Sequence, residues 1–97
     1  KSICIVLCSN GYPDTYKKNI EIKNINLIKL NNNDYLFHAG TSKVNDKIVA
    51  TGGRVLNFVS VSDNFADGKK NIHNHLDKLN WSEGFYRKDI GFKVINK

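Results

Sequence analysis

The sequence predicts a single α+β domain with a mainly antiparallel β-sheet and one principal helix near residues 64–79. Three observations lead to this prediction. Short segments rich in β-branched and aromatic residues alternate with polar turns up to residue 61, and a helical spacing of apolar residues appears only after that point. The length of 97 residues suits one domain, and no change of composition divides residues 1–97.

The first predicted strand covers residues 2–9, where apolar side chains follow one another almost without interruption. It ends at a turn over residues 10–14, in which Pro13 fixes its own φ and biases Tyr12 to an extended conformation. We therefore expect an ordered loop here. Residues 20–30 show only short alternations without helix caps, and we predict short strands and turns for them.

A strand, a hairpin and another strand are expected next. Residues 35–39 are predicted as a strand, and residues 43–50 as a β-hairpin, because Asn45–Asp46 tolerates the left-handed backbone that a tight turn requires. Residues 54–61 have the β-branched and aromatic composition of a further strand.

The helix is predicted from apolar residues that recur on one stripe of a 3.6-residue period, namely Phe65, Ile72, Leu76 and Leu79. Asp63 is expected to cap its N-terminus. His73 and His75 are expected on its exposed side without a function. The aromatic segment 81–97 is expected to pack back on the sheet.

The two cysteines predict neither a disulfide nor a metal site. Cys4 and Cys8 share one face of the first strand about 13 Å apart, which is too far for a bond between them. No histidine has a zinc-type spacing to them, and His38 is interpreted as an ordinary strand residue. We interpret both cysteines as small buried hydrophobes in a reducing cytoplasm.

Charge and composition exclude several function classes. The net charge of +6 comes mainly from dispersed lysines, with few arginines or aromatic platforms between them, so nucleic acid is not an expected partner. The longest apolar run, residues 3–8, is far too short to span a bilayer, so no membrane partner is expected either. The chain has only two glutamates, no close carboxylate pair and no nucleotide-binding fingerprint, which predicts no catalytic residues.

Four blocks of residues resemble the C-terminal domain of the phosphoribosylamine–glycine ligases, also called glycinamide ribonucleotide synthetases. They occur in the order and approximate spacing of that family, at residues 10–13, 37–41, 52–56 and 85–91. The first block has Asn10 where the family often has a second glycine, and residues 19–34 match poorly. The resemblance therefore spans nearly the whole chain, with differences in its loops.

The resemblance implies that the chain is the C-terminal domain of a longer ATP-grasp ligase, with the fold of a small barrel-sandwich element or rudiment single hybrid motif. Enzymes of this family join glycine to 5-phosphoribosylamine in purine biosynthesis, using ATP and magnesium held by an ATP-grasp module. The N-terminal and ATP-grasp domains are then the partners of this chain, which by itself holds no cofactor and is expected to be inactive. The start at Lys1 and the absence of Met fit this expectation.

The resemblance also implies substrate-binding residues. Gly52 and Gly53 would let the backbone approach an anion, and Arg54 would offer a forked contact to phosphate oxygens. Tyr12 and Pro13 would line the same cleft. The alternative is that the two glycines form a simple bulge beside a solvated arginine.

Arg87 and Asp89 are expected to form an internal ion pair that anchors the end of the chain. Two other functions stay open at this point. One is the equivalent domain of another ATP-grasp enzyme such as a biotin carboxylase, and the other is a free-standing basic binding module.

Overall fold

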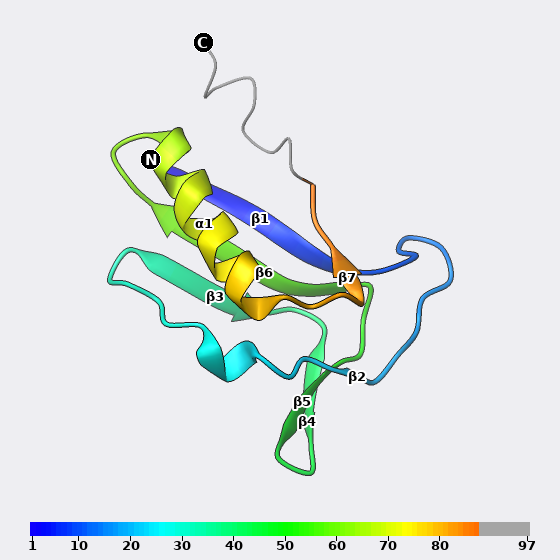
Figure 1. The fold of residues 1–97 in the computed structure, drawn as a ribbon. Helices are drawn as coiled ribbons and strands as arrows, with labels where there is room; N and C mark the ends of the chain where they lie inside the picture. The colour runs from blue at the N-terminus through cyan, green and yellow to red at the C-terminus, as the bar shows by residue number, and fades with distance from the viewer. Residues whose placement is uncertain (88–97) are drawn as a thin grey trace.

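The computed structural model describes residues 1–87, which form two antiparallel sheets, one α-helix and a short 3₁₀ helix (Figure 1). The elements in chain order are β1 (Ser2–Ser9), β2 (Ile20–Glu21), η1 (Ile25–Leu27), β3 (Asp34–His38), β4 (Thr41–Val44), β5 (Lys47–Ala50), β6 (Arg54–Val61), α1 (Phe65–Leu79) and β7 (Gly84–Phe85). The predicted α+β class, with mainly antiparallel strands and one principal helix, is confirmed.

The larger sheet has four strands in the order β3-β6-β1-β7, and the smaller sheet has three in the order β2-β5-β4. The long pairing of β1 with β6 forms the centre of the larger sheet, where Ile5 lies opposite Phe58. The register of this pair is irregular between Leu7 and Cys8. The smaller sheet contains the β4–β5 hairpin, which projects from the body of the molecule (Figure 1).

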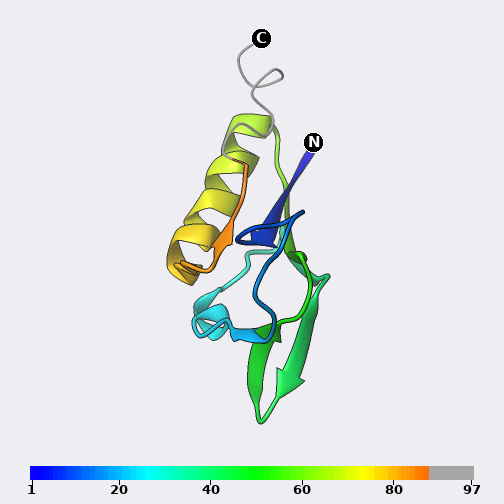
Figure 2. The ribbon, with the colours of Figure 1, turned by 90° about the vertical axis from the view of Figure 1, so that its right-hand side faces the viewer.

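Helix α1 covers only one face of the four-stranded sheet (Figure 2). Alternate side chains of β1 therefore point either toward the helix or away from it. The inner set, which consists of Ile3, Ile5 and Leu7, is buried in the core, and the remaining side chains form the outer set. Gly68 permits this close packing, because a Cβ there would meet Cγ2 of Ile3 at 2.9 Å. Burial of this apolar surface is the main stabilising term.

The helix is capped by Asn64 and not by Asp63, so that prediction was wrong. The Asn64 side-chain oxygen accepts a hydrogen bond from the backbone N–H of Asp67 at 2.8 Å. A capping side chain must sit directly before the first helical residue to reach that N–H. Asp63 lies one position too early, because the helix begins at Phe65.

His75 is buried, which contradicts its predicted exposed position. It lies three residues after Ile72 and four before Leu79, and so faces the sheet with them. Its Nε2 is 2.7 Å from Oδ2 of Asp34, whose other oxygen accepts a hydrogen bond from the Ser60 hydroxyl at 2.7 Å. These three residues tie α1 to β3 and β6 across the core.

His73 is half-buried, and the prediction of an exposed position is also wrong for it. Its ring meets the edge of Tyr86, with the ring centroids 5.4 Å apart. Tyr86 comes from the segment after the helix, and burial raises the pKa of its phenol, with a smaller contribution from the negative charge of Asp77.

The cysteines are not core residues, which corrects the prediction made for them. Cys4 is exposed and Cys8 is half-buried, and both are free thiols. They belong to the outer set of β1, on the face that α1 does not cover. Partial burial raises the pKa of both thiols, and for Cys8 the positive charge of Arg54 opposes this effect.

The segment after the helix packs back in part, as predicted. The indole N–H of Trp81 donates to the carbonyl of Glu21 at 3.0 Å, and β7 pairs with the end of β1. The predicted Arg87–Asp89 ion pair falls outside the described residues, which end at Arg87.

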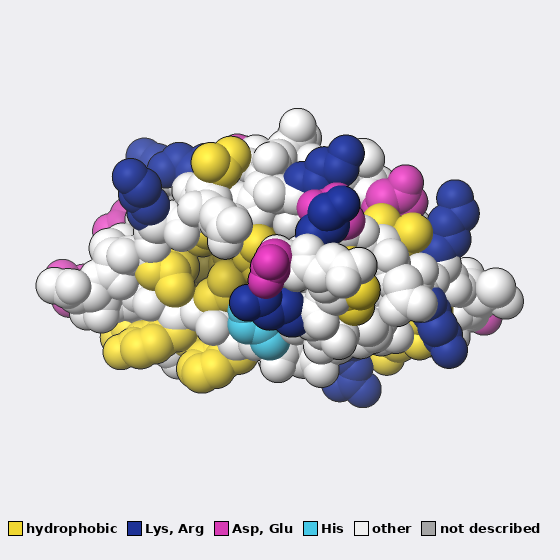
Figure 3. Space-filling view, turned by 90° about the horizontal axis from the view of Figure 1, so that it is seen from below, with side chains coloured by type: hydrophobic (Ala, Val, Ile, Leu, Met, Phe, Trp, Pro, Cys, Tyr) yellow, Lys and Arg dark blue, Asp and Glu magenta, His cyan; other side chains and the backbone are white. Residues whose placement is uncertain are grey.

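Lysine and arginine side chains are spread over the surface and do not form one patch in the view of Figure 3. This distribution agrees with the interpretation of the net charge as a dispersed, solvated set of lysines. Within residues 1–87, no helix has the length and hydropathy needed to cross a membrane.

The buried contacts of Asp34 lead to a prediction about stability. Asp34→Ala leaves His75 and Ser60 without their partner inside the core, and we expect the free energy of unfolding to fall by about 3 kcal/mol. Urea denaturation measures this change. Asp14→Ala, at an exposed carboxylate in the loop after β1, is the control and should change stability by less than about 0.5 kcal/mol. Equal effects of the two substitutions would contradict the structural role of Asp34.

Candidate functional site

Three of the predicted site residues meet where the loop after β1 crosses the start of β6. Gly53 is buried beneath the ring of Tyr12, which occupies the space that a Cβ at Gly53 would need. The Tyr12 hydroxyl accepts a hydrogen bond from Nε of Arg54 at 3.2 Å. The residues of two separate sequence blocks therefore form one cluster, which we call the Arg54 cluster: Tyr12, Gly53 and Arg54.

The backbone under this cluster is held on two sides. The Ser9 amide donates to the carbonyl of Gly53 at 2.7 Å, and its hydroxyl donates to that of Gly52 at 2.9 Å. The Gly52 amide donates to the carbonyl of Gly40 at 3.3 Å, so this N–H points into the fold. Arg54, the third residue of this block, is exposed and has the donors of its guanidinium at the surface.

Arg54 is exposed, and its terminal NH₂ groups have no hydrogen-bond or ion-pair partner among residues 1–87. The bond from Nε to Tyr12 restricts the side chain and leaves the fork free. A guanidinium in this state can bind the oxygens of a phosphate or carboxylate in a bidentate manner. The chemistry that the cluster supports is therefore anion binding.

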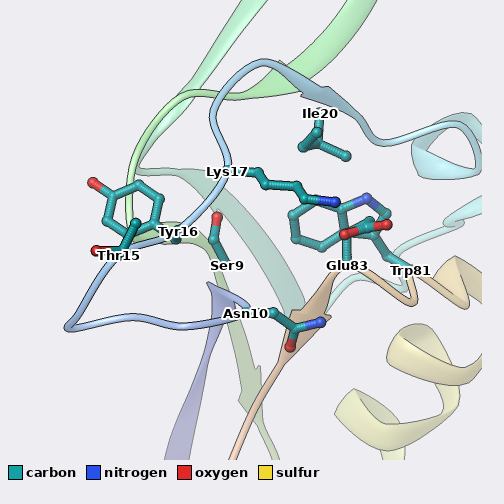
Figure 4. Close-up of a pocket in the computed structure, with 8 residues that line it drawn as sticks. All are labelled: Ser9, Asn10, Thr15, Tyr16, Lys17, Ile20, Trp81 and Glu83. Carbon is teal, nitrogen blue, oxygen red and sulfur yellow. The ribbon is translucent and has the colours of Figure 1, made fainter.

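A pocket of about 280 Å³ lies on the other side of the same loop (Figure 4). In Figure 4 the side chains of Lys17 and Glu83 point toward one another above the indole of Trp81. Tyr16 lines this pocket, and its ring centroid lies 6.3 Å from that of Tyr12. Tyr12 of this loop thus belongs to the Arg54 cluster, and Tyr16 of the same loop lines the pocket.

No pattern in the sequence indicates this pocket. Lys17 and Glu83 come from opposite ends of the chain, and no local motif surrounds either of them. Tertiary contacts bring them together: β7 pairs with the end of β1 beside Glu83, and the Asn19 amide, two residues after Lys17, donates to the carbonyl of Ala50.

The other predicted residues lie nearby or elsewhere. Pro13 is exposed next to Tyr12 and lines an apolar groove of about 340 Å³, to which Arg87 also contributes. His38 is an exposed residue of strand β3, as predicted, and its Nδ1 is 2.8 Å from the hydroxyl of Thr41. In the part of the chain that the structure describes, no three His, Cys, Asp or Glu side chains gather into a possible metal site.

Comparison with known proteins gives a consistent result. Residues 2–93 match the family described as Phosphoribosylglycinamide synthetase, C domain. The chain is 36% identical over 90 residues to a phosphoribosylamine–glycine ligase of Caldanaerobacter subterraneus, covering 93% of this chain and 21% of the relative. It is 39% identical over 94 residues to the enzyme of the same name from Agrobacterium fabrum, covering 97% of this chain and 22% of the relative.

A solved structure supports the same relationship. The crystal structure of a phosphoribosylamine–glycine ligase from Thermotoga maritima superposes with a TM-score of 0.73 at 28% sequence identity, covering 92% of this chain and 21% of that one. The chain thus spans about a fifth of the length of these relatives. With a family match over nearly its whole length, the chain belongs to the phosphoribosylglycinamide synthetase C-domain family.

Proposed function

We propose that this chain is the C-terminal domain of a phosphoribosylamine–glycine ligase, which joins glycine to 5-phosphoribosylamine with ATP and gives glycinamide ribonucleotide in purine biosynthesis. The family match and the names of the relatives support this assignment. The structural observation that carries the role of this domain is the exposed guanidinium of Arg54 beside Tyr12, whose terminal NH₂ groups have no partner among residues 1–87.

In this proposal, Arg54 binds the phosphate of 5-phosphoribosylamine. The phosphate is negatively charged and accepts hydrogen bonds on several oxygens. The two terminal NH₂ groups of the Arg54 guanidinium can donate to these oxygens. Tyr12 holds the arginine through Nε, and Gly53 supplies the space for the tyrosine ring. A substrate anchored by its phosphate loses less rotational freedom when it reacts, so the domain contributes positioning and not bond-making groups.

The domain also forms one wall of the active site in this proposal. Excluding water from such a site protects a reactive intermediate and strengthens each charge contact inside it. Pro13 and the apolar groove beside it support this role, because they place a non-polar surface next to the Arg54 cluster.

The proposal includes the partners and cofactors of the enzyme. The N-terminal and ATP-grasp domains would complete the active site and would bind ATP and magnesium. The residues described in this chain do not form a metal site. We place the enzyme in the cytoplasm, where free thiols such as Cys4 and Cys8 persist.

Arg54→Ala in the complete enzyme tests the central role. Removing the charged contact should lower kcat/KM for 5-phosphoribosylamine by roughly ten- to 150-fold. Arg54→Lys should restore only part of this loss, because lysine keeps the charge and lacks the fork. Steady-state kinetics with varied 5-phosphoribosylamine provides the measurement.

Lys43→Ala is the control for Arg54→Ala. It removes an exposed cation from the β4–β5 hairpin, where the side chain is 68% exposed, and should leave kcat/KM unchanged. If Arg54→Ala kept the wild-type efficiency, or if both variants lost the same factor, the phosphate-binding role would be excluded.

Tyr12→Phe tests how Arg54 is held. The substitution keeps the ring over Gly53 and removes the hydroxyl that accepts from Nε. One hydrogen bond of this kind is worth about 1 kcal/mol, so we expect a loss of roughly fivefold in kcat/KM with little change in Tm. A loss as large as that of Arg54→Ala would mean instead that the hydroxyl itself binds the substrate.

The isolated chain is expected to have no ligase activity. Its described residues offer an anion contact but neither a metal site nor a paired set of acid and base groups. The measurement is ADP release that depends on both glycine and 5-phosphoribosylamine, with the complete enzyme as the positive control. Turnover by residues 1–97 alone would contradict the assignment of the chemistry to the other domains.

A further inference from the structure

The face of the four-stranded sheet opposite α1 is apolar and uncovered by any described element (Figure 2). Its side chains are the outward members of neighbouring strands, and we call this surface the outer face: Cys4, Val6, Tyr35, Phe37, Val59 and Phe85, with the uncharged amide of Asn57 between Val6 and Phe37. Phe37 is 55% exposed and Tyr35 is 47% exposed, with their rings stacked at 6.3 Å. Exposed aromatic clusters of this kind mark interaction surfaces.

The outer face is also free of charge over most of its area. In a chain with 25% charged residues, the outward positions of β3 and β1 and the later ones of β6 carry none. Arg54 stands at the start of β6, at the margin of this surface. In the view from below, hydrophobic side chains gather at the lower left, apart from most of the lysines and arginines (Figure 3). A surface without charge fits another apolar protein surface and not a polyanion.

The groove of about 340 Å³ connects this face with the Arg54 cluster. Cys4 and Val6 of the outer face line the groove together with Tyr12 and Pro13. A body seated on the outer face would therefore extend to the Tyr12 side of the candidate phosphate site.

We propose that the outer face is the surface on which the rest of the ligase polypeptide packs. The relatives carry this domain as about 21% of their length, so most of the enzyme is available as the occupant. Packing there would bury Tyr35 and Phe37 and place Arg54 at the rim of the cleft between the domains. This inference rests on the proposed function, since it takes the partner to be the remainder of that enzyme.

The first test compares two apolar residues of similar exposure in the complete enzyme. Phe37→Asp places a charge on the outer face, whereas Val44→Asp places one on the β4–β5 hairpin, where Val44 is 47% exposed. If the outer face is buried, Phe37→Asp should lower the Tm of the enzyme by roughly 4 °C or more and Val44→Asp should change it little. Equal, small shifts for the two variants would overturn the proposal.

The second test uses the native thiol of Cys4 and needs no substitution. Cys4 is exposed on the outer face of this domain, so coverage by another domain should slow its alkylation by N-ethylmaleimide. Mass spectrometry of the peptide that contains Cys4 gives the rate in the folded enzyme and in urea. We expect a rate at least about tenfold lower in the folded enzyme, and similar rates would overturn the proposal even if Phe37→Asp failed to fold.

Two other occupants give different results in the same assay. Protection of Cys4 that is lost on dilution, together with dissociation of an oligomer in light scattering, would assign the face to a second copy of the enzyme and overturn the proposal. Protection that is lost when the enzyme ends at Arg87 would assign it to residues 88–97, with the same consequence. The two tests measure stability and labelling, and neither measures turnover. They can therefore be interpreted even if Arg54 proves to have no role in catalysis.

Discussion

The antiparallel pairing of β1 with β6 is the constraint on which the rest of the structure depends. Its eight-residue strands lie at the centre of the larger sheet and bring the first and later parts of the chain into one register. Because side chains alternate across a strand, this register decides which residues enter the core and which form the outer face. Ile5 and Phe58 face the helix, whereas Cys4 and Val59 face away from it.

The position of the Arg54 cluster also depends on the pairing of β1 with β6, at the end of the pair where the register is irregular. The register shifts after Leu7, and Ser9 then binds the carbonyls of the two glycines that precede β6. Such irregularities change the direction of a strand and reorient the side chains beside them. Here the result is that Arg54 projects outward while Gly53 lies beneath Tyr12. The site is thus a product of how the central strands end.

The two faces of the sheet have different physical characters. The inner face is closed by α1, with apolar packing and a polar cluster in which Asp34 bonds both His75 and Ser60. A buried carboxylate is tolerated there because both of its oxygens have partners. Among the described residues, the outer face has no such polar network and exposes the rings of Tyr35 and Phe37. This asymmetry between the two faces is the basis of the proposed packing of the outer face against the rest of the enzyme.

The sequence by itself determined the class, the central strands, the hairpin and the helix, because alternation, turn residues and a helical stripe are local signals. Residue blocks also indicated the family and brought Arg54 into consideration. What only the tertiary structure decided depends on contacts between distant segments: the burial of His75 against Asp34, the exposure of Cys4, and the pocket between Lys17 and Glu83. A local pattern predicts a strand, whose side chains alternate between two faces. Which of these faces is buried depends on where the helix packs, and the helix lies far from the strand in the sequence.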